Sequence, residues 1–170
     1  MKKIILFFLI IMLALMPGIA QEKRQLVSNF HLQLDLQTKY VWRGMEMITE
    51  ESAPVLFPQI NYQYKGLYVY VMGGYAINGK YGEVDLGISY THKWLTVGIY
   101  DYYYPTTNTP DDNYFNLKGR ETGHWIEGAV TIAPENIPAY ITISSFRAGP
   151  DKKTDGKQAY STYAELGGHY

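Results

Sequence analysis

The 170-residue sequence contains no cysteine, and beyond residue 20 it contains no apolar run long enough to cross a membrane as a helix. The first absence excludes disulfide bonds, so the fold must be held by hydrogen bonds and packing alone. The second absence restricts any membrane-spanning structure to a closed β-sheet, because lipid offers no partners for backbone polar groups. The length predicts one domain.

The N-terminus has the pattern of a cleaved signal peptide. A basic start at residues 1–3 precedes the apolar run of residues 4–16, and the small residues Gly18 and Ala20 predict cleavage after Ala20. Thirteen apolar residues fall short of the roughly 20 that a spanning helix needs. We therefore expect a signal peptide at residues 1–20 and a β-domain at residues 21–170.

Charge argues against a nucleic-acid partner. Loss of Lys2 and Lys3 leaves 13 basic and 16 acidic residues, a net charge of −3. Phosphate binding requires a basic patch, and none is present.

What the sequence does contain is a repeated alternation of apolar and polar residues, supported by 17 tyrosines and 16 glycines. From residue 29 to 43, Leu32, Leu34 and Leu36 share one face, while Gln33 and Asp35 lie on the other. The same period of two predicts seven further strands. Their expected positions are residues 59–64, 67–76, 83–91, 95–100, 126–132, 141–144 and 162–170.

The connections between these segments alternate in length. Short turns at Lys65-Gly66, His92-Lys93 and residues 134–138 separate longer links at residues 44–53, 78–82, 105–121 and 148–158. This order is typical of an antiparallel up-and-down transmembrane β-barrel with long loops at one rim and tight turns at the other.

Alternation alone leaves two interpretations open, because a soluble lipocalin-like secreted barrel also alternates, with its apolar face inside. Polar lining residues and aromatic residues near strand ends favour the membrane interpretation. The expected lumen-facing polar residues are Gln33, Asp35, Lys39, Arg43, Gln59, Asn61, Gln63, Glu83, Asp85, Glu127 and Glu165. The expected aromatic girdle at the lipid headgroups is Tyr40, Trp42, Tyr62, Tyr64, Tyr90, Trp94, Tyr103 and Tyr104.

The segment from Tyr40 to Gly44 (YVWRG), Pro54, the Phe57-Pro58-Gln59 triplet and the stretch at residues 95–105 (LTVGIYDYYYP) carry a family resemblance. With these motifs the chain resembles the TorF-like porin family of bacterial outer-membrane β-barrel proteins. The resemblance implies an outer-membrane location and passive passage of small solutes. Members of that family run longer, so we expect either a truncated copy or a minimal eight-stranded version.

Two interpretations of the charged residues remain open. Arg43, Lys39 and Asp35 could form a charged constriction that selects ions. Alternatively, the basic side chains pair with Glu83, Asp85, Glu127 and Glu165 across the lumen and fill it, since eight strands enclose only enough room for side chains.

Catalysis finds little support in the sequence. Of the four histidines, only His124 is expected near the long loops, where Asp101, Asp111 or a loop hydroxyl could join it. We expect no enzyme activity, no metal and no cofactor. Tyr100, Tyr102, Tyr103, Tyr104 and Trp125 could stack a sugar at the outer mouth, or belong to the membrane girdle.

The sequence thus predicts a small outer-membrane barrel, either a porin or a structural barrel, whose partner is the lipid bilayer. The alternatives are a surface binding protein that uses its long loops, chiefly residues 105–121, and the soluble lipocalin-like barrel. The sequence identifies neither the solute nor an oligomeric state.

Overall fold

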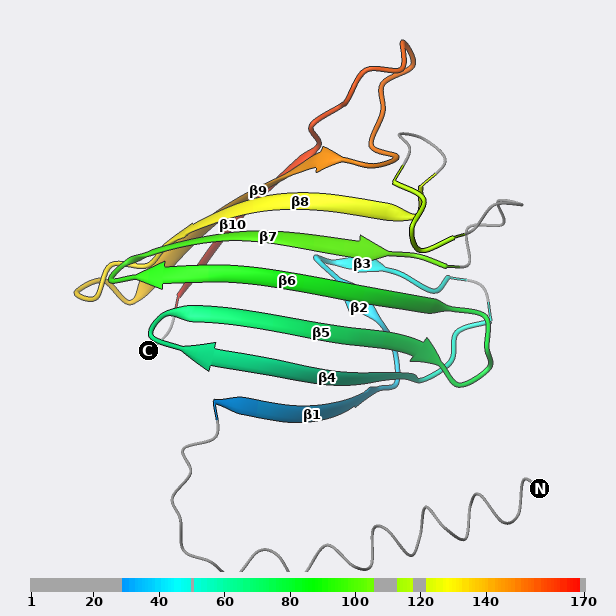
Figure 1. Ribbon diagram of the computed structural model, residues 1–170, viewed down its shortest axis with the longest axis horizontal. Helices are drawn as coiled ribbons and strands as arrows, with labels where there is room; N and C mark the ends of the chain where they lie inside the picture. The colour runs from blue at the N-terminus through cyan, green and yellow to red at the C-terminus, as the bar shows by residue number, and fades with distance from the viewer. Residues whose placement is uncertain (1–28, 50, 106–112, 118–121, 169–170) are drawn as a thin grey trace, which may run out of the picture.

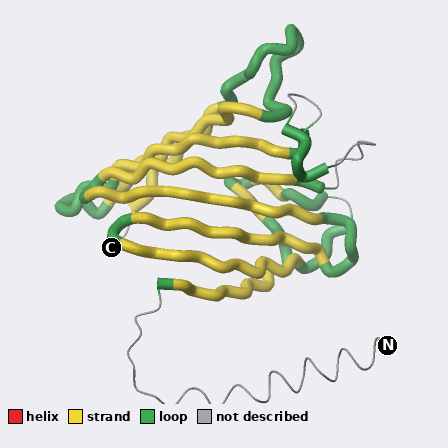
Figure 2. The backbone as a smooth tube through the Cα atoms, viewed as in Figure 1, coloured by secondary structure: helices red, strands yellow, loops and turns green. Residues whose placement is uncertain are grey.

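The computed structural model describes residues 29–49, 51–105, 113–117 and 122–168, and within them all regular structure is β-strand (Figure 2). The predicted signal peptide, residues 1–20, lies outside the described residues. The strands are β1 (Phe30–Gln37), β2 (Val41–Trp42), β3 (Met45–Glu46), β4 (Val55–Tyr64), β5 (Leu67–Ala76), β6 (Gly82–His92), β7 (Leu95–Tyr103), β8 (His124–Ile132), β9 (Ala139–Ala148) and β10 (Thr162–Gly168).

Eight of these strands form one antiparallel sheet in the order β1-β4-β5-β6-β7-β8-β9-β10. Each predicted strand therefore exists, and each pairs with its neighbour along the chain. The connections β4–β5, β6–β7 and β8–β9 lie at one end of the sheet, and the longer connections lie at the other (Figure 1). We call these the turn end and the loop end.

The sheet does not close into a barrel, which corrects that part of the sequence prediction. Within the described residues, β1 pairs only with β4, and β10 pairs only with β9, so both edges of the sheet are unpaired there. These two edge strands are short, with eight residues in β1 and seven in β10. β1 is also shorter than predicted because the chain leaves the sheet after Gln37.

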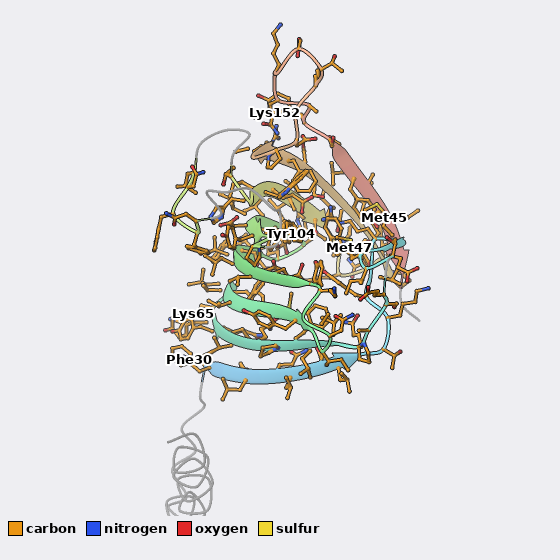
Figure 3. The ribbon with its side chains drawn as sticks, turned by 90° about the vertical axis from the view of Figure 1, so that its right-hand side faces the viewer. Phe30, Met45, Met47, Lys65, Tyr104 and Lys152 are labelled. Carbon is orange, nitrogen blue, oxygen red and sulfur yellow. The ribbon has the colours of Figure 1, made fainter. Side chains whose placement is uncertain are left out.

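The residues that leave the sheet form a separate small hairpin, β2–β3, in place of the second half of the predicted first strand. Trp42 pairs with Met45, and the two residues between them, Arg43 and Gly44, have φ angles of +51° and +78°. Two consecutive positive φ angles are characteristic of the tight turns whose twist matches that of the flanking strands. The hairpin lies on the concave side of the curled sheet (Figure 3).

The two faces of the sheet are inverted relative to a water-soluble protein. On the convex face the row Leu32, Leu34 and Leu36 is exposed by 82%, 67% and 63%. The convex residues of the other strands are similarly exposed, among them Ile60, Val71, Ile88, Val97, Ile99, Val130, Ile141, Ile143 and Leu166.

The concave face instead buries polar groups. Glu83, Asp85, Asn61 and Glu127 are all nearly inaccessible. A small apolar cluster of Ile48, Ala53, Val55, Phe57 and Ala76 lies at the loop end of this face, with Tyr40, Met72 and Tyr81 packed against it. In the described part of the chain, the buried apolar cluster of the concave face therefore lies near the loop end.

Glycines on the concave face make room for tyrosine rings from neighbouring strands. Gly87 lies opposite Tyr70, and a Cβ atom added to Gly87 would come 2.1 Å from Cε1 of that ring. The Tyr70 ring packs in turn against Tyr68 and Tyr100, with centroid separations of 5.7 and 6.3 Å. The ring therefore cannot move without disturbing its neighbours.

We expect Gly87→Ala to lower the free energy of unfolding by about 1–3 kcal/mol, because the new methyl group must displace the Tyr70 ring. Chemical denaturation of the protein folded in detergent micelles measures the change. Gly128→Ala is the matched control, since its Cβ would meet no atom closer than 3.7 Å. Equal effects of the two substitutions would contradict this account of the packing.

Candidate functional site

The clearest candidate site is the contact between the β2–β3 hairpin and the concave face. The Arg43 guanidinium donates two parallel hydrogen bonds to the Glu127 carboxylate on β8, at 2.7 and 2.8 Å. The Tyr102 hydroxyl, on β7, donates a third hydrogen bond to the same carboxylate at 2.9 Å. Glu127 is 1% exposed and the Arg43 side chain 18% exposed, so this is an ion pair largely shielded from water.

Two aromatic rings complete the surroundings of Arg43. Its guanidinium carbon lies 4.2 Å from the centroid of the Trp42 ring and 4.5 Å from that of Tyr163 on β10. Guanidinium groups are attracted to the faces of such rings, the more so where water is excluded. The hairpin, which follows β1 in the chain, is thereby joined to both β8 and β10.

A second polar cluster lies on β6. Glu83 and Asp85 both face the concave side, and each has one carboxylate oxygen without a hydrogen-bond partner among the described residues. The Tyr81 hydroxyl donates to the other Glu83 oxygen at 2.6 Å. Burial raises the pKa of Tyr81, and the Glu83 carboxylate raises it further, so Tyr81 keeps its proton for this bond.

No basic side chain forms an ion pair with Glu83 or Asp85 within the described part of the chain. Arg43 is already matched by Glu127. Among the described residues, the concave face therefore carries more acidic than basic side chains.

The other predicted lumen residues occupy varied positions. Gln59 bonds Tyr68 on the concave face, and Glu165 accepts hydrogen bonds from Tyr140 and Tyr163. Gln33, Asp35 and Gln63 are exposed near the turn end or on the open edge strand. Lys39 is a correction: it follows the end of β1 and pairs with Glu46 of the hairpin at 2.9 Å, because the strand in which it was expected ends at Gln37. No charged constriction of Arg43, Lys39 and Asp35 is present.

The predicted aromatic girdle divides into two groups. At the turn end, Tyr62, Tyr64 and Tyr90 lie on the convex face, and Trp94 is exposed in the β6–β7 turn. At the loop end, three of the expected girdle residues lie inside instead. Tyr40 packs on Phe57, Trp42 on Tyr102, and Tyr104 on Tyr81. Tyr40 and Trp42 belong to the segment that leaves the sheet after Gln37, and Tyr104 follows β7 on the same face as Tyr102.

The fourth loop-end ring, Tyr103, points to the convex side but is covered by Tyr114. There His124 lies between two oxygen acceptors: Nδ1 is 2.7 Å from Asp101 Oδ2, and Nε2 is 2.5 Å from the Tyr114 carbonyl oxygen. These contacts hold residues 113–117 against the sheet.

The pairing of His124 with Asp101 is one that the sequence suggested for a hydrolase. Here, however, the second ring nitrogen is engaged by a backbone carbonyl rather than by a hydroxyl nucleophile. Asp111, the other suggested acid, lies outside the described residues. The arrangement is better suited to fixing the loop than to catalysis, and the absence of enzyme activity stays a prediction.

Within the described residues, no group of three or more histidine or acidic side chains is arranged to hold a metal ion. Nor does this part of the chain contain a helix of the length and hydropathy needed to cross a membrane. The sugar-stacking cluster is also split, with Tyr103 on the convex side and Trp125, packed on Phe146, on the concave side.

Comparison of the chain with protein-family models, with curated proteins and with solved structures gave no match. The resemblance to TorF-like porins is therefore a prediction from sequence motifs alone.

We expect Arg43→Met to lower the free energy of unfolding by about 3 kcal/mol, because it leaves the Glu127 carboxylate buried without its counter-ion. The double substitution Arg43→Met with Glu127→Met should restore most of the loss, since neither charge then remains. Urea denaturation of Arg43→Met, Glu127→Met and the double variant in micelles measures this coupling. Additive losses in the double variant would mean that the two side chains do not depend on each other.

Proposed function

We propose that the chain is an outer-membrane β-protein whose convex face lies in lipid and whose concave face lines a solute path. The observation that carries the proposal is the inverted burial: apolar rows are exposed while carboxylates are enclosed. In water such an outer surface would be unfavourable, because soluble monomers rarely expose contiguous apolar patches larger than a few hundred Å². In lipid the same surface is solvated.

Strand length supports this placement. The six strands from β4 to β9 have 9 to 11 residues each, the length that crosses the hydrocarbon core when a strand is tilted. The convex rings of Tyr62, Tyr64 and Tyr90 near the turn end suit the headgroup region on one side. A lipocalin-like soluble barrel would need the opposite orientation, with Leu32, Leu34 and Leu36 inside.

Lipid also imposes closure. The free edges of β1 and β10 carry backbone groups that lipid cannot satisfy, so an embedded sheet needs partners for both. We infer that β1 and β10 pair with each other in the membrane to give an eight-stranded barrel. The hairpin supports pairing of β1 with β10 of the same chain rather than with another molecule. Arg43 lies a few residues after β1 and already contacts Tyr163 of β10.

Passage through such a barrel depends on the hairpin. An eight-stranded barrel is just wide enough for its own side chains, and here the β2–β3 hairpin occupies part of the interior. The Arg43–Glu127 pair holds it there. The proposed activity is therefore a restricted, cation-preferring path for small solutes that widens when the hairpin moves.

The lipid-facing orientation can be tested with single cysteines, because the natural chain has none. Val97 and Thr96 are neighbours on β7, one on the convex face and one on the concave face. Val97→Cys and Thr96→Cys are labelled with an environment-sensitive fluorophore while unfolded and then refolded into vesicles containing a spin-labelled lipid. We expect quenching at position 97 to exceed that at 96 by about threefold or more, since only residue 97 would face acyl chains.

Equal quenching at the two positions, or stronger quenching at 96, would contradict insertion in this orientation. Thr96 bonds Thr91 on the concave face near the open turn end, where a label has room. A second pair, Val130→Cys with Thr131→Cys on β8, repeats the comparison on another strand.

Conductance in planar bilayers tests the solute path itself. We expect the natural chain to give small steps with preference for K⁺ over Cl⁻, and Arg43→Ala to enlarge them by about twofold or more by allowing the hairpin to be displaced. Arg147→Ala is the matched control, because Arg147 lies outside the concave site, with its guanidinium near the Tyr160 ring. If the Arg43→Ala variant inserts into the bilayer but gives no conductance steps, the porin function is rejected in favour of a structural barrel.

A further inference from the structure

A cavity of about 440 Å³ lies between the hairpin and the concave face, near the loop end. Its lining comes from five separate parts of the chain that meet only in the folded protein: Trp42, Met45, Met47, Tyr81, Tyr104, Trp125 and Phe146. Figure 3 labels Met45 and Met47 on the hairpin side of this region and Tyr104 on the sheet side. The volume is within the range of about 300–1,000 Å³ that is typical of small-molecule sites.

The surface of the cavity is almost entirely carbon and sulfur. Trp125 and Phe146 pack edge to face with centroids 5.2 Å apart, and Tyr81 and Tyr104 do the same at 6.4 Å. The Tyr81 hydroxyl is directed to Glu83, so that its ring rather than its oxygen is available to a ligand. Methionine side chains adapt to the shape of what they contact. These features fit a flat or compact apolar molecule.

Charge restricts the ligand further. The nearest ion pair, Arg43 with Glu127, lines an adjoining space of about 200 Å³ that shares Trp42, Met45 and Phe146 with the main cavity. Both charges are already satisfied by each other. An anionic ligand would give up hydration without gaining a free cationic partner, because the Arg43 guanidinium is already matched by Glu127.

We propose that this cavity binds an uncharged organic molecule of one or two fused rings, held by stacking between the aromatic side chains. A sugar fits less well, because it needs several hydrogen-bonding partners around its rim. The proposal does not depend on conduction: the site exists in the folded chain whether or not the barrel passes solutes.

Tryptophan fluorescence gives a direct test. The chain has three tryptophans, of which Trp42 and Trp125 line the cavity and Trp94 is exposed at the turn end. In a Trp94→Phe background, all the signal therefore comes from the cavity. The probe is coumarin, an uncharged two-ring compound, titrated into the protein folded in zwitterionic micelles. Coumarin-3-carboxylate has the same rings with a charge, and glucose represents sugars.

We expect saturable quenching by coumarin, weaker binding of coumarin-3-carboxylate, and no effect of glucose. Phe146→Ala should weaken coumarin binding by at least about fivefold, because a stacking ring is lost. Met45→Lys should do the same by introducing an unmatched charge, and it should fold because Met45 is 54% exposed. The control Ile137→Ala lies in an exposed turn and should leave binding unchanged.

Quenching that rises linearly without saturation would show mere partition into micelles and overturn the proposal. It is equally overturned if Ile137→Ala weakens binding as much as the cavity variants, if both cavity variants bind coumarin normally, or if the carboxylate or glucose binds more tightly. Should Phe146→Ala fail to fold, Met45→Lys decides alone.

Discussion

The structure depends on one constraint, which is that the concave face encloses carboxylate groups while the apolar rows of the convex face are exposed. A folded chain ordinarily gains stability by removing apolar surface from water, and here Leu32, Leu34 and Leu36 gain nothing of the kind. The enclosed side supplies hydrogen bonds and an ion pair instead, among them those that Glu127 forms with Arg43 and Tyr102. This distribution of apolar and polar side chains is what supports the proposal that the convex face lies in lipid.

The same constraint explains the features of the concave face. Tyrosine is the residue that can fill a polar interior, because its ring provides volume and its hydroxyl provides a hydrogen bond. Tyr68, Tyr81 and Tyr102 each donate or accept such a bond on this face. Where a ring lies flat on the sheet, as Tyr70 does, the opposing residue is a glycine. The unusual tyrosine and glycine content is therefore a consequence of building the interior from aromatic polar residues.

The sequence was sufficient to predict the features that follow from the two-residue alternation of apolar and polar side chains, namely the strands and their faces. It placed all eight sheet strands, including residues 67–76, whose second face carries tyrosines, and it placed Glu83, Asp85 and Glu127 on a shared face. It failed where the chain turns without an ordinary signal. The alternation continues through Tyr40 and Trp42, so it predicts an unbroken strand there. The turn that follows is Arg43-Gly44, and arginine before glycine does not signal a tight turn in the way that asparagine before glycine does. The Arg43–Glu127 contact joins residues 84 positions apart. The shared polar face made Glu127 one of four candidate partners for the basic side chains, but no local pattern identified which one.

The hairpin also determines how the interior can be used. Without it, eight strands would enclose tyrosine and carboxylate side chains and little free space. With it, Trp42, Met45 and Met47 are placed opposite Tyr104, Trp125 and Phe146, which makes an apolar cavity inside an otherwise polar face. Since both ends of the hairpin are joined to the sheet through β1 and β4, it can be displaced but not released. The hairpin lines the cavity, and Arg43 on its turn fixes it to Glu127, so a ligand in the cavity would contact the same element that narrows the proposed path. Under the two proposals above, ligand binding and solute passage would therefore be coupled through one ion pair.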